Sequence, residues 1–280
     1  MIVVADSGST KCDWIFKDGE HRVEISTMGF NPMFHSSDFI AEELGKNELF
    51  KKNAAETLEV FFYGAGCSSE KRNDIVRRGL EVAFPKATLN IEHDLKGAVY
   101  AACQGKPGIA CILGTGSNSA YFDGQTIQEE VPALGYILGD EGSGAFFGKQ
   151  LISEYLYKQL PDNIVAKFEE RYPELTKDDV FTGVYMQPHA NVYLSSFMRF
   201  LSDNRDEKYI QEMVYRGLST FIDIHIWQYK NYKSLPVHFV GSIAFYFESV
   251  LRKAASNHRL NVGRIIRKPV EELLRHHSQA

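Results

Sequence analysis

The chain has 280 residues, a formal net charge of −5, 44% hydrophobic and 24% charged residues; these ordinary fractions exclude disordered, collagen-like and coiled-coil proteins. Lys and Arg, 31 against 36 Asp and Glu, are scattered and form no basic stripe, which argues against a nucleic-acid partner. A chain longer than roughly 250 residues tends to divide into two hydrophobic cores, so we expect two domains.

The first half of the chain predicts elements in the order β-β-β-α-β-α-β-α. An apolar strand at 2–5 ends at the small-residue turn Asp6–Thr10, and Asp18-Gly19 is a strong hairpin signal. Hydrophobic periodicity and turn residues place the remaining elements. They are strands at 12–16, 21–27, 60–63 and 88–92, and helices around 39–44, 75–84 and 94–103.

The second half repeats this opening. An apolar strand at 109–113 ends at the turn Gly114–Ser117, and a second strand at 119–122 ends at Asp123-Gly124. Two halves that each begin with a hairpin and a small-residue turn indicate an internal duplication. The later predicted elements are a long helix after 142 with apolar positions from 146 to 160, a largely helical region over 164–229 with its clearest helix at 210–226, a buried strand at 237–240, a helix through 245–251 and a last helix from Pro269.

The two small-residue turns are candidate phosphate sites. Backbone N–H groups in such a turn form a concave array without Cβ atoms to block a phosphate. One such turn is common without any ligand, but two at matching places could grip a triphosphate, and Asp6 could hold Mg²⁺ against it. The chain lacks G-x-x-x-x-G-K-[ST], and G-x-G-x-x-G after its first strand, so a nucleotide would be held between domains.

Three polar residues each allow a structural and a functional interpretation. Asp94, at a strand-to-helix junction, is either a plain N-cap or a base that accepts the proton of a hydroxyl attacking the γ-phosphoryl group. Asp140, in a Gly-rich segment, either stabilises a helix N-terminus through its negative charge near the helix dipole or accepts hydrogen bonds from sugar-type hydroxyls. Asn31, before Pro32, is either a turn residue or a ligand contact.

Six segments together resemble the family of N-acetylglucosamine kinases and BadF/BadG-type ATPases. They occur in the family's order from residue 1 to about 250, and G-T-G-S-N with G-D-E-G-S is the most specific pair. The segments are Asp6-Ser7-Gly8-Ser9-Thr10-Lys11, Gly29-Phe30-Asn31-Pro32, His93-Asp94-Leu95-Lys96-Gly97-Ala98, Leu113-Gly114-Thr115-Gly116-Ser117-Asn118, Leu138-Gly139-Asp140-Glu141-Gly142-Ser143-Gly144 and Val240-Gly241-Ser242-Ile243-Ala244.

The resemblance implies an α/β fold of two RNase H-like, actin/hexokinase-type domains with a cleft between them. We expect an N-terminal domain over 1–105 and a C-terminal domain over 106–267, with a helical insertion at about 161–205. A C-terminal helix at about 268–280 could pack back on the first domain.

The resemblance also implies ATP-dependent phosphorylation of a small-molecule amino sugar at its 6-hydroxyl, with ATP and Mg²⁺ as cofactors. N-Acetylglucosamine is the first candidate, Asp94 is the implied general base and Asp6 lies near the metal. The implied nucleotide contacts are Ser9, Thr10, Lys11, Gly114, Thr115, Gly116, Gly241 and Ser242. The implied sugar contacts are Asn31, Ser117, Asn118, Gly135 and Asp140.

Two departures from the family pattern leave questions open. Ala133-Leu134-Gly135-Tyr136 stands where the sugar kinases tend to carry Gly-Trp-Gly, which bears on the acyl group of the sugar. The segment 263–269 replaces a Gly-Ala-rich C-terminal helix, which bears on the adenosine end. N-Acetylglucosamine, N-acetylmuramic acid and glucosamine, and a monomer or homodimer, therefore stay open.

Two alternative functions belong to other classes. One is a BadF-type activator ATPase with an iron–sulfur cluster bridging a dimer, for which Cys103 and Cys111 are poorly spaced. The other is a non-catalytic sugar or nucleotide sensor. We expect all four cysteines to be reduced and mostly buried. No apolar run approaches ~20 residues, and the opening MIVVADSGST resembles no signal peptide, so we expect a cytoplasmic protein without a membrane partner.

Overall fold

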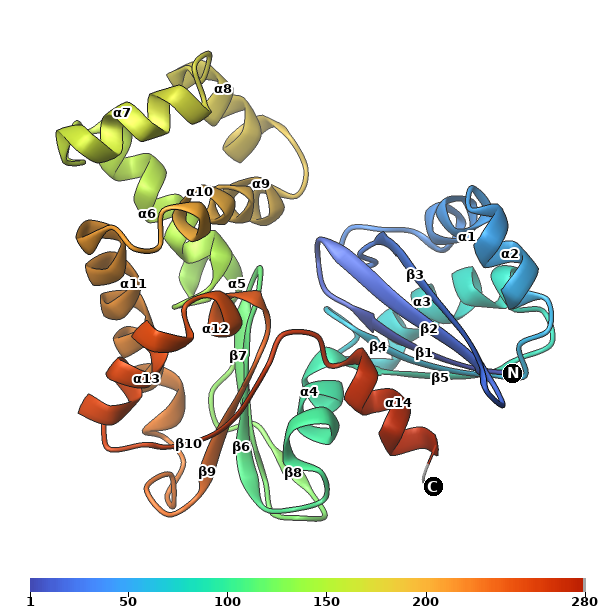
Figure 1. Cartoon of the computed structure of the whole chain (residues 1–280). Coiled ribbons are helices and arrows are strands. Elements are labelled where there is room, and N and C mark those ends of the chain that lie inside the picture. The colour runs from blue at the N-terminus through green and yellow to red at the C-terminus, as the bar shows by residue number, and fades with distance from the viewer. Residues whose placement is uncertain (279–280) are drawn as a thin grey trace. The chain divides into compact units, whose positions relative to one another are not determined.

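The structure, a computed structural model, describes residues 1–278 and divides into two compact units (Figure 1). Unit 1 comprises 1–106, Gly124–Ile127 and the chain from Lys268 onward, and unit 2 comprises Pro107–Asp123 and Gln128–Arg267. Residues 279 and 280, which the predicted helix 268–280 includes, lie outside the described residues. Each unit has its own hydrophobic core.

Unit 1 contains a five-stranded sheet in the order β3-β2-β1-β4-β5. β1 pairs antiparallel with β2 and parallel with β4; β2 pairs antiparallel with β3, and β4 pairs parallel with β5. Its strands are β1 (Ile2–Ser7), β2 (Lys11–Asp18), β3 (His21–Met28), β4 (Glu59–Gly64) and β5 (Thr88–His93). Its helices are α1 (Ser37–Gly45), α2 (Glu48–Ala54), α3 (Glu70–Ala83), α4 (Asp94–Cys103) and α14 (Val270–Ser278).

Aromatic side chains fill the core of unit 1. Trp14 and Phe16 lie two positions apart on β2 and so point to the same face of the sheet. The Trp14 ring packs edge-on against Phe50, with 5.0 Å between ring centroids, and its Nε1–H donates to Thr27 Oγ1 at 3.0 Å. This fully buried indole therefore has its polar group satisfied, as a stable core requires.

Unit 2 repeats the sheet of unit 1. Its order is β10-β9-β6-β7-β8, which places the first strand of each unit between the second and the fourth. β6 pairs antiparallel with β7 and parallel with β9, and β9 pairs parallel with β10. The strands are β6 (Gly108–Leu113), β7 (Ser117–Phe122), β8 (Ile127–Gln128), β9 (Pro236–Val240) and β10 (Asn261–Ile266). The predicted duplication and α/β fold class are confirmed.

Helices make up the rest of unit 2. The core packs Phe147 of α6 and Phe221 of α11 with strand residues such as Phe239. The helices of unit 2 are α5 (Gly135–Leu138), α6 (Gly144–Leu156), α7 (Asp162–Arg171), α8 (Lys177–Phe181), the π-helix η1 (Thr182–Met186), α9 (Ala190–Ser196), α10 (Met198–Asp203), α11 (Lys208–Phe221), the π-helix η2 (Ile222–Ile226), α12 (Ser242–Tyr246) and α13 (Glu248–Asn257). No helix among residues 1–278 has the length and apolar character needed to span a membrane.

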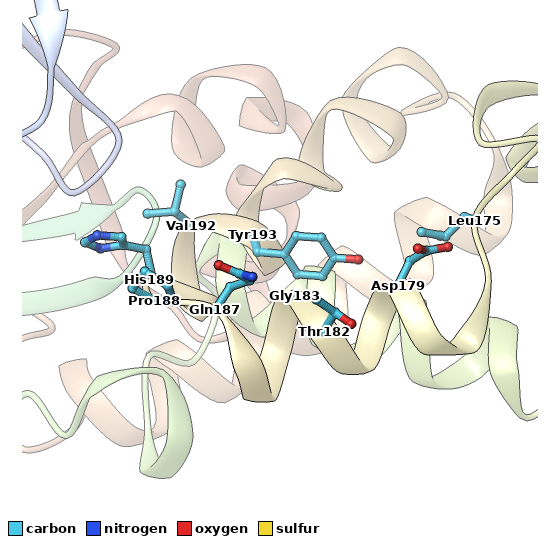
Figure 2. Close-up of a pocket in the computed structure, with 9 residues that line it drawn as sticks. All are labelled: Leu175, Asp179, Thr182, Gly183, Gln187, Pro188, His189, Val192 and Tyr193. Atoms are coloured by element: carbon cyan, nitrogen blue, oxygen red, sulfur yellow. The ribbon is translucent and has the colours of Figure 1, made fainter.

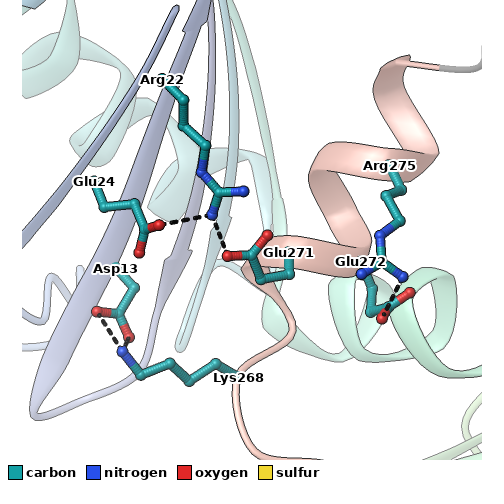
Figure 3. Close-up of polar contacts among 7 residues, drawn as sticks. All are labelled: Asp13, Arg22, Glu24, Lys268, Glu271, Glu272 and Arg275. Atoms are coloured by element: carbon teal, nitrogen blue, oxygen red, sulfur yellow. Dashed lines mark hydrogen bonds and ion pairs between the residues drawn. The ribbon is translucent and has the colours of Figure 1, made fainter. Parts of the chain in front are cut away.

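The C-terminal helix α14 packs on unit 1, where it contacts α4, β1 and β2. Arg22 of β3 forms a hydrogen bond with Glu271 (Figure 3). Gln104 donates to Glu272 at 3.0 Å. The His277 ring stacks on Phe61 at 3.6 Å between centroids. Burial, reinforced by the neighbouring His276, lowers the pKa of His277 to about 4, so this ring is neutral near pH 7.

Some element predictions need correction. β10 pairs with β9 at the sheet edge, although its residues Val262, Ile265 and Ile266 are interrupted by Gly and Arg and give no clear alternation. α6 ends at Leu156, before the predicted 160, because the chain turns into the left-handed region at Lys158, with φ 58°. The predicted helix through 245–251 is two helices that meet at Phe247.

Candidate functional site

The segment that follows β3 packs against the turn between β1 and β2 and forms hydrogen bonds with it. The Gly8 N–H donates to the Lys11 carbonyl at 3.0 Å, and the Phe30 N–H donates to Ser7 Oγ at 2.9 Å. A Cβ on Gly29 would lie 1.9 Å from the Gly8 carbonyl oxygen, so only glycine permits this approach. Ser9 and Thr10, predicted to bind the nucleotide, lie at the solvent side of this braced turn.

Three carboxylates influence one another at this end of the sheet. Asp6, near the end of β1, is the direct cross-strand partner of Asp13 on β2, so both side chains point to the same face. Burial, and then the negative charges of Asp94 and Asp13, raise the pKa of Asp6 to about 7, whereas Lys268 opposes the rise. The face therefore carries negative charge that is incompletely neutralised.

Asp13 is held by cations and a hydroxyl. Its Oδ1 lies 2.7 Å from Lys11 Nζ and accepts a hydrogen bond from Ser26 Oγ at 2.7 Å, and its Oδ2 lies 3.3 Å from Lys268 Nζ (Figure 3). Burial alone would raise the pKa of Asp13, but these hydrogen bonds and positive charges lower it overall. Asp13 is therefore ionised, which leaves Asp6 next to a fixed negative charge. The sequence pattern did not indicate either Asp13 or Lys268.

Asp94 is the first residue of α4, and the prediction of an Asp94 N-cap is wrong by one position. His93, the last residue of β5, takes the N-cap position with an extended backbone, because the helix starts directly where the β4–β5 pairing ends. His93 Nε2 lies 3.1 Å from Asp94 Oδ1, and Asp94 remains 22% exposed. Burial raises the pKa of Asp94, although His93 and backbone N–H groups lower it in part.

These carboxylates fit a magnesium ion that arrives with phosphate groups. Mg²⁺ commonly binds through one or two carboxylates, with substrate phosphates and water completing its octahedron. No group of three His, Cys, Asp or Glu side chains in residues 1–278 is arranged as a protein-only cage. The raised pKa of Asp6 identifies it as the carboxylate whose charge a cation would stabilise most directly.

Asn31 is buried and organises the turn after β3. Its Oδ1 accepts a hydrogen bond from the Met33 N–H at 2.9 Å, and its own N–H donates to His35 Nδ1 at 3.2 Å. A Cβ on Gly66, which has φ 80°, would lie 2.3 Å from Asn31 Oδ1. The turn role is thus present, and a sugar contact by Asn31 stays a prediction.

In unit 2, the turn after β6 is tied to the start of α6. The N–H of Gly144 donates to the Gly114 carbonyl at 2.8 Å, and the N–H of Ala145 donates to the Thr115 carbonyl at 3.0 Å. Ser143 caps the helix by accepting from the Phe146 N–H at 3.2 Å. The predicted phosphate turn therefore has a rigid base.

Asp140 lies directly beside this turn. Its Oδ1 accepts from the Ser117 N–H at 3.2 Å, and Ser117 Oγ donates to the Glu141 carbonyl at 2.8 Å. A Cβ on Gly116 would lie 3.0 Å from the Asp140 carboxylate. Asp140 has φ 57°, an uncommon conformation for a residue with a Cβ that these contacts hold in place.

Gly241 brings a third segment to the same place. It follows β9 with φ 123°, and a Cβ there would lie 2.3 Å from the Leu113 carbonyl oxygen. The turn Gly241-Ser242 therefore packs on the residue that begins the Gly114 turn. Only glycine combines this backbone conformation with such a close approach.

The remaining predicted residues of unit 2 differ in their surroundings. Asn118 is buried on β7, and its Oδ1 accepts from the Ser119 N–H at 2.8 Å. Gly135 is exposed and begins helix α5 with φ 72°, and nothing lies within 4 Å of a Cβ added to it. Sequence reasoning missed His225, a buried imidazole whose Nε2 lies 3.5 Å from Glu141 Oε2 and whose pKa burial lowers. Its place on the apolar face of a helix was the only available signal.

A pocket of about 480 Å³ lies elsewhere in unit 2, at η1 and α9 (Figure 2). None of the residues that the sequence predicts for the site lines it. Its wall includes the ring of Tyr193, which packs so closely on Gly183 that a Cβ there would lie 2.6 Å from the ring. This pocket is therefore separate from the turn and the residues of unit 2 described above.

Comparisons with known proteins bear on the fold and the family. No protein-family model and no curated protein matches the chain. A solved candidate N-acetylglucosamine kinase from Porphyromonas gingivalis is 34% identical, with 100% of this chain and 99% of that chain covered and a TM-score of 0.91. Another from Chromobacterium violaceum is 16% identical (98% and 98% covered, TM-score 0.69), and a glucose-bound hexokinase from Schistosoma mansoni is 14% identical (100% and 85%, TM-score 0.57).

The last two similarities show the fold alone, whereas the first extends over the whole chain at substantial identity. The strand order, which is the same in both units, is consistent with this similarity. The chain belongs to the family of N-acetylglucosamine kinases and BadF/BadG-type ATPases, within the actin/hexokinase-like ATPase superfamily.

Proposed function

We propose that the protein transfers the γ-phosphoryl group of ATP to the 6-hydroxyl of an amino sugar, with N-acetylglucosamine as the first candidate. The carrying observation is Asp94, an accessible carboxylate at the carboxyl end of β5 with a raised pKa. Carboxyl ends of parallel strands are where α/β proteins bind ligands. The name of the 34% identical relative supports the sugar class.

Asp94 would act as the general base. A raised pKa makes its carboxylate a better proton acceptor than an ordinary surface Asp, and positioned bases of this kind contribute roughly 10²–10⁴-fold in rate. His93, 3.1 Å away, would hold the carboxylate in orientation and stabilise its charged form. The proton of the sugar hydroxyl would pass to Asp94 as the oxygen attacks phosphorus, and ADP would leave.

The two braced turns would bind the phosphates, with Ser9, Thr10 and Lys11 from unit 1 and Gly114, Thr115 and Gly116 from unit 2. Their backbone N–H groups supply donors that cost little reorganisation when charge shifts in the transition state. Mg²⁺, when bound at Asp6, would supply charge neutralisation of the phosphates. Gly241 and Ser242 would lie against the adenosine.

Asp140 would orient the sugar hydroxyls, since its carboxylate stands beside Ser117 and Gly116 and is fixed in a strained backbone. Asn31, Asn118 and Gly135 complete the proposed sugar contacts. A protein carboxylate that accepts a hydrogen bond from a sugar hydroxyl discriminates strongly against analogues that lack this hydroxyl. Contacts to the acyl group of the sugar would differ from those in the sugar kinases, because Ala133-Leu134-Gly135-Tyr136 stands in place of their Gly-Trp-Gly stretch.

A coupled ADP-release assay tests this function. The purified protein is assayed with Mg²⁺ and ATP against N-acetylglucosamine, N-acetylmuramic acid, glucosamine and glucose, each with and without the metal. Asp94→Asn should lower kcat by about 10²–10⁴-fold with ATP binding nearly unchanged. Asp38→Asn, an exposed first-turn Asp of α1, serves as the matched control and should retain full activity.

Sugar-dependent ADP release that survives Asp94→Asn would contradict the role of Asp94. Sugar binding by calorimetry without turnover would favour the sensor instead. The activator alternative has no specific support, because all four cysteines are buried.

A further inference from the structure

A buried histidine in unit 2 lies beside the turn that carries Asp140. His225 belongs to the π-helix η2, and its side chain is 4% exposed. The Trp227 N–H donates to the Ile222 carbonyl at 3.2 Å, which is the five-residue spacing of a π-helix, a form found frequently at functional sites. The His225 ring stacks on Phe221 of α11 with 4.6 Å between the centroids. Packing therefore fixes the plane of the ring.

One edge of this ring faces Glu141, the residue after Asp140. His225 Nε2 lies 3.5 Å from Glu141 Oε2, whereas His225 Nδ1 is buried and has no hydrogen-bond partner among residues 1–278. Burial lowers the pKa of His225, so the imidazole is neutral near pH 7 and carries one N–H. A proton on Nδ1 would be a buried donor without an acceptor, so we assign it to Nε2. His225 thus directs a hydrogen-bond donor at the Glu141 carboxylate.

The backbone of the turn is held by Ser117 and Ser143. The Ser117 N–H donates to Asp140 Oδ1 at 3.2 Å, and its hydroxyl donates to the Glu141 carbonyl at 2.8 Å. The Ser143 N–H donates to the Asp140 carbonyl at 3.1 Å. Asp140 has φ 57°, and a residue with a Cβ keeps such a conformation only where the surrounding contacts impose it.

The other side of the turn rests on the helix that carries His225. A Cβ on Gly142 would lie 3.1 Å from the Cβ of Phe221, the same residue on which the His225 ring stacks. The side chain of Glu141 is 18% exposed and reaches across to His225. The turn is therefore connected to η2 both by packing and by one polar contact, all within unit 2.

We propose that His225 is a positioning residue which, through Glu141, holds the Asp140 carboxylate in the geometry that binds the sugar hydroxyls. This inference rests on the proposed contact between Asp140 and the sugar. When a binding-competent conformation is only partly populated, the apparent affinity falls by that fraction. Loss of the His225 donor would therefore weaken sugar binding and leave the chemical step unchanged, since the proposed base, Asp94, belongs to unit 1.

ADP-release kinetics of the full-length protein with Mg²⁺, ATP and N-acetylglucosamine separate this role from packing. His225→Leu keeps an apolar side chain against Phe221 and removes the donor. It should raise the KM for the sugar about tenfold, with kcat and the KM for ATP unchanged within twofold. Thermal unfolding should occur at the same or a higher temperature, because the unpartnered Nδ1 is removed as well.

Two further variants test the contact itself. His225→Gln restores a side-chain N–H donor and should recover more than half of the lost sugar affinity on a logarithmic scale. Glu141→Gln changes the partner without altering the core, and adding His225→Leu to it should raise the KM less than twofold further, because both substitutions act on one contact. His258→Leu is the control, since it removes a different histidine–carboxylate contact of unit 2, in which His258 Nε2 lies 3.2 Å from Asp223 Oδ1.

The possible failures are distinguishable. An unchanged sugar KM in a folded His225→Leu protein that turns over N-acetylglucosamine would overturn the role of His225 alone. A fall in kcat and unfolding temperature that His225→Gln does not reverse would make His225 a packing residue. If the parent releases no ADP with N-acetylglucosamine, N-acetylmuramic acid, glucosamine or glucose, the proposed function fails and the positioning role fails with it.

Discussion

Replacing Gly241 by alanine should damage unit 2 specifically. The backbone at Gly241 has φ 123° and ψ 169°, a region that non-glycine residues occupy at a cost of about 1–3 kcal/mol. The added Cβ would also lie 2.3 Å from the Leu113 carbonyl oxygen, and a forced backbone shift of this kind costs a further 1–3 kcal/mol, roughly. We therefore expect Gly241→Ala to lower the stability of the strands around this turn by about 2–6 kcal/mol.

Hydrogen exchange followed by mass spectrometry measures this change strand by strand. At 1.36 kcal/mol per tenfold, amides of β6 and β9 should exchange at least about 30-fold faster in Gly241→Ala. Amides of β1 and β4 in unit 1 should keep their protection. The matched control is Gly19→Ala, since Gly19 also has a positive φ, 56°, but nothing lies within 4 Å of its added Cβ.

The control should cost only about 1–2 kcal/mol, the conformational cost of a left-handed residue. Protection of β6 and β9 within threefold of the parent in Gly241→Ala would refute the steric reasoning. The same result would also weaken the case that glycine is required where the Gly241 turn meets the Gly114 turn.

Further predictions concern charge. Asp6→Asn should abolish phosphoryl transfer yet raise the thermal unfolding temperature at pH 8 without nucleotide. At that pH the Asp6 carboxylate is above its pKa of about 7, and its buried negative charge beside Asp94 and Asp13 destabilises the folded state. A lower unfolding temperature in the variant would contradict this. His277 has a pKa of about 4 in the folded chain and about 6.5 in the unfolded chain, so protons bind the unfolded state more tightly. The neutral ring therefore contributes up to about 2 kcal/mol, after screening, to the free energy of unfolding above pH 6.5, and this contribution is lost as the pH falls toward 4. After correction for the intrinsic pH dependence of amide exchange, the protection factors of the α14 amides should therefore fall between pH 6.5 and 4 in the parent and fall less in His277→Asn; equal pH dependence in both would refute it.

Much of the fold follows from local sequence signals. Asp18-Gly19 and Asp123-Gly124 mark turns that do not depend on distant residues, and the apolar runs at 2–5 and 109–113 indicate β1 and β6. The repetition of that pattern identifies the duplication. Strand β10 escapes prediction because Gly263 and Arg264 interrupt its apolar residues, and its identity as a strand depends on pairing with β9.

The candidate site is predicted in part for the same reason. Gly114, Asp140 and Gly241 stand in recognisable glycine-rich segments, so their importance is visible locally. Whether Asp94 occupies the N-cap or the first helical position depends on where the β4–β5 pairing ends, which the sequence does not specify to one residue. Residues of ordinary appearance, such as His225, gain a role only through their neighbours.

The sequence alone thus determined the two repeated hairpins, their glycine turns and the residue types able to hold phosphate and a sugar hydroxyl, because backbone conformation and periodicity act over short stretches. Tertiary structure decided the electrostatics: Lys268 lies 255 positions from Asp13 and still forms an ion pair with it, and burial, together with the charges of Asp94 and Asp13, raises the pKa of Asp6 to about 7. Coulomb interactions and burial depend on distance in space, which only the folded chain establishes.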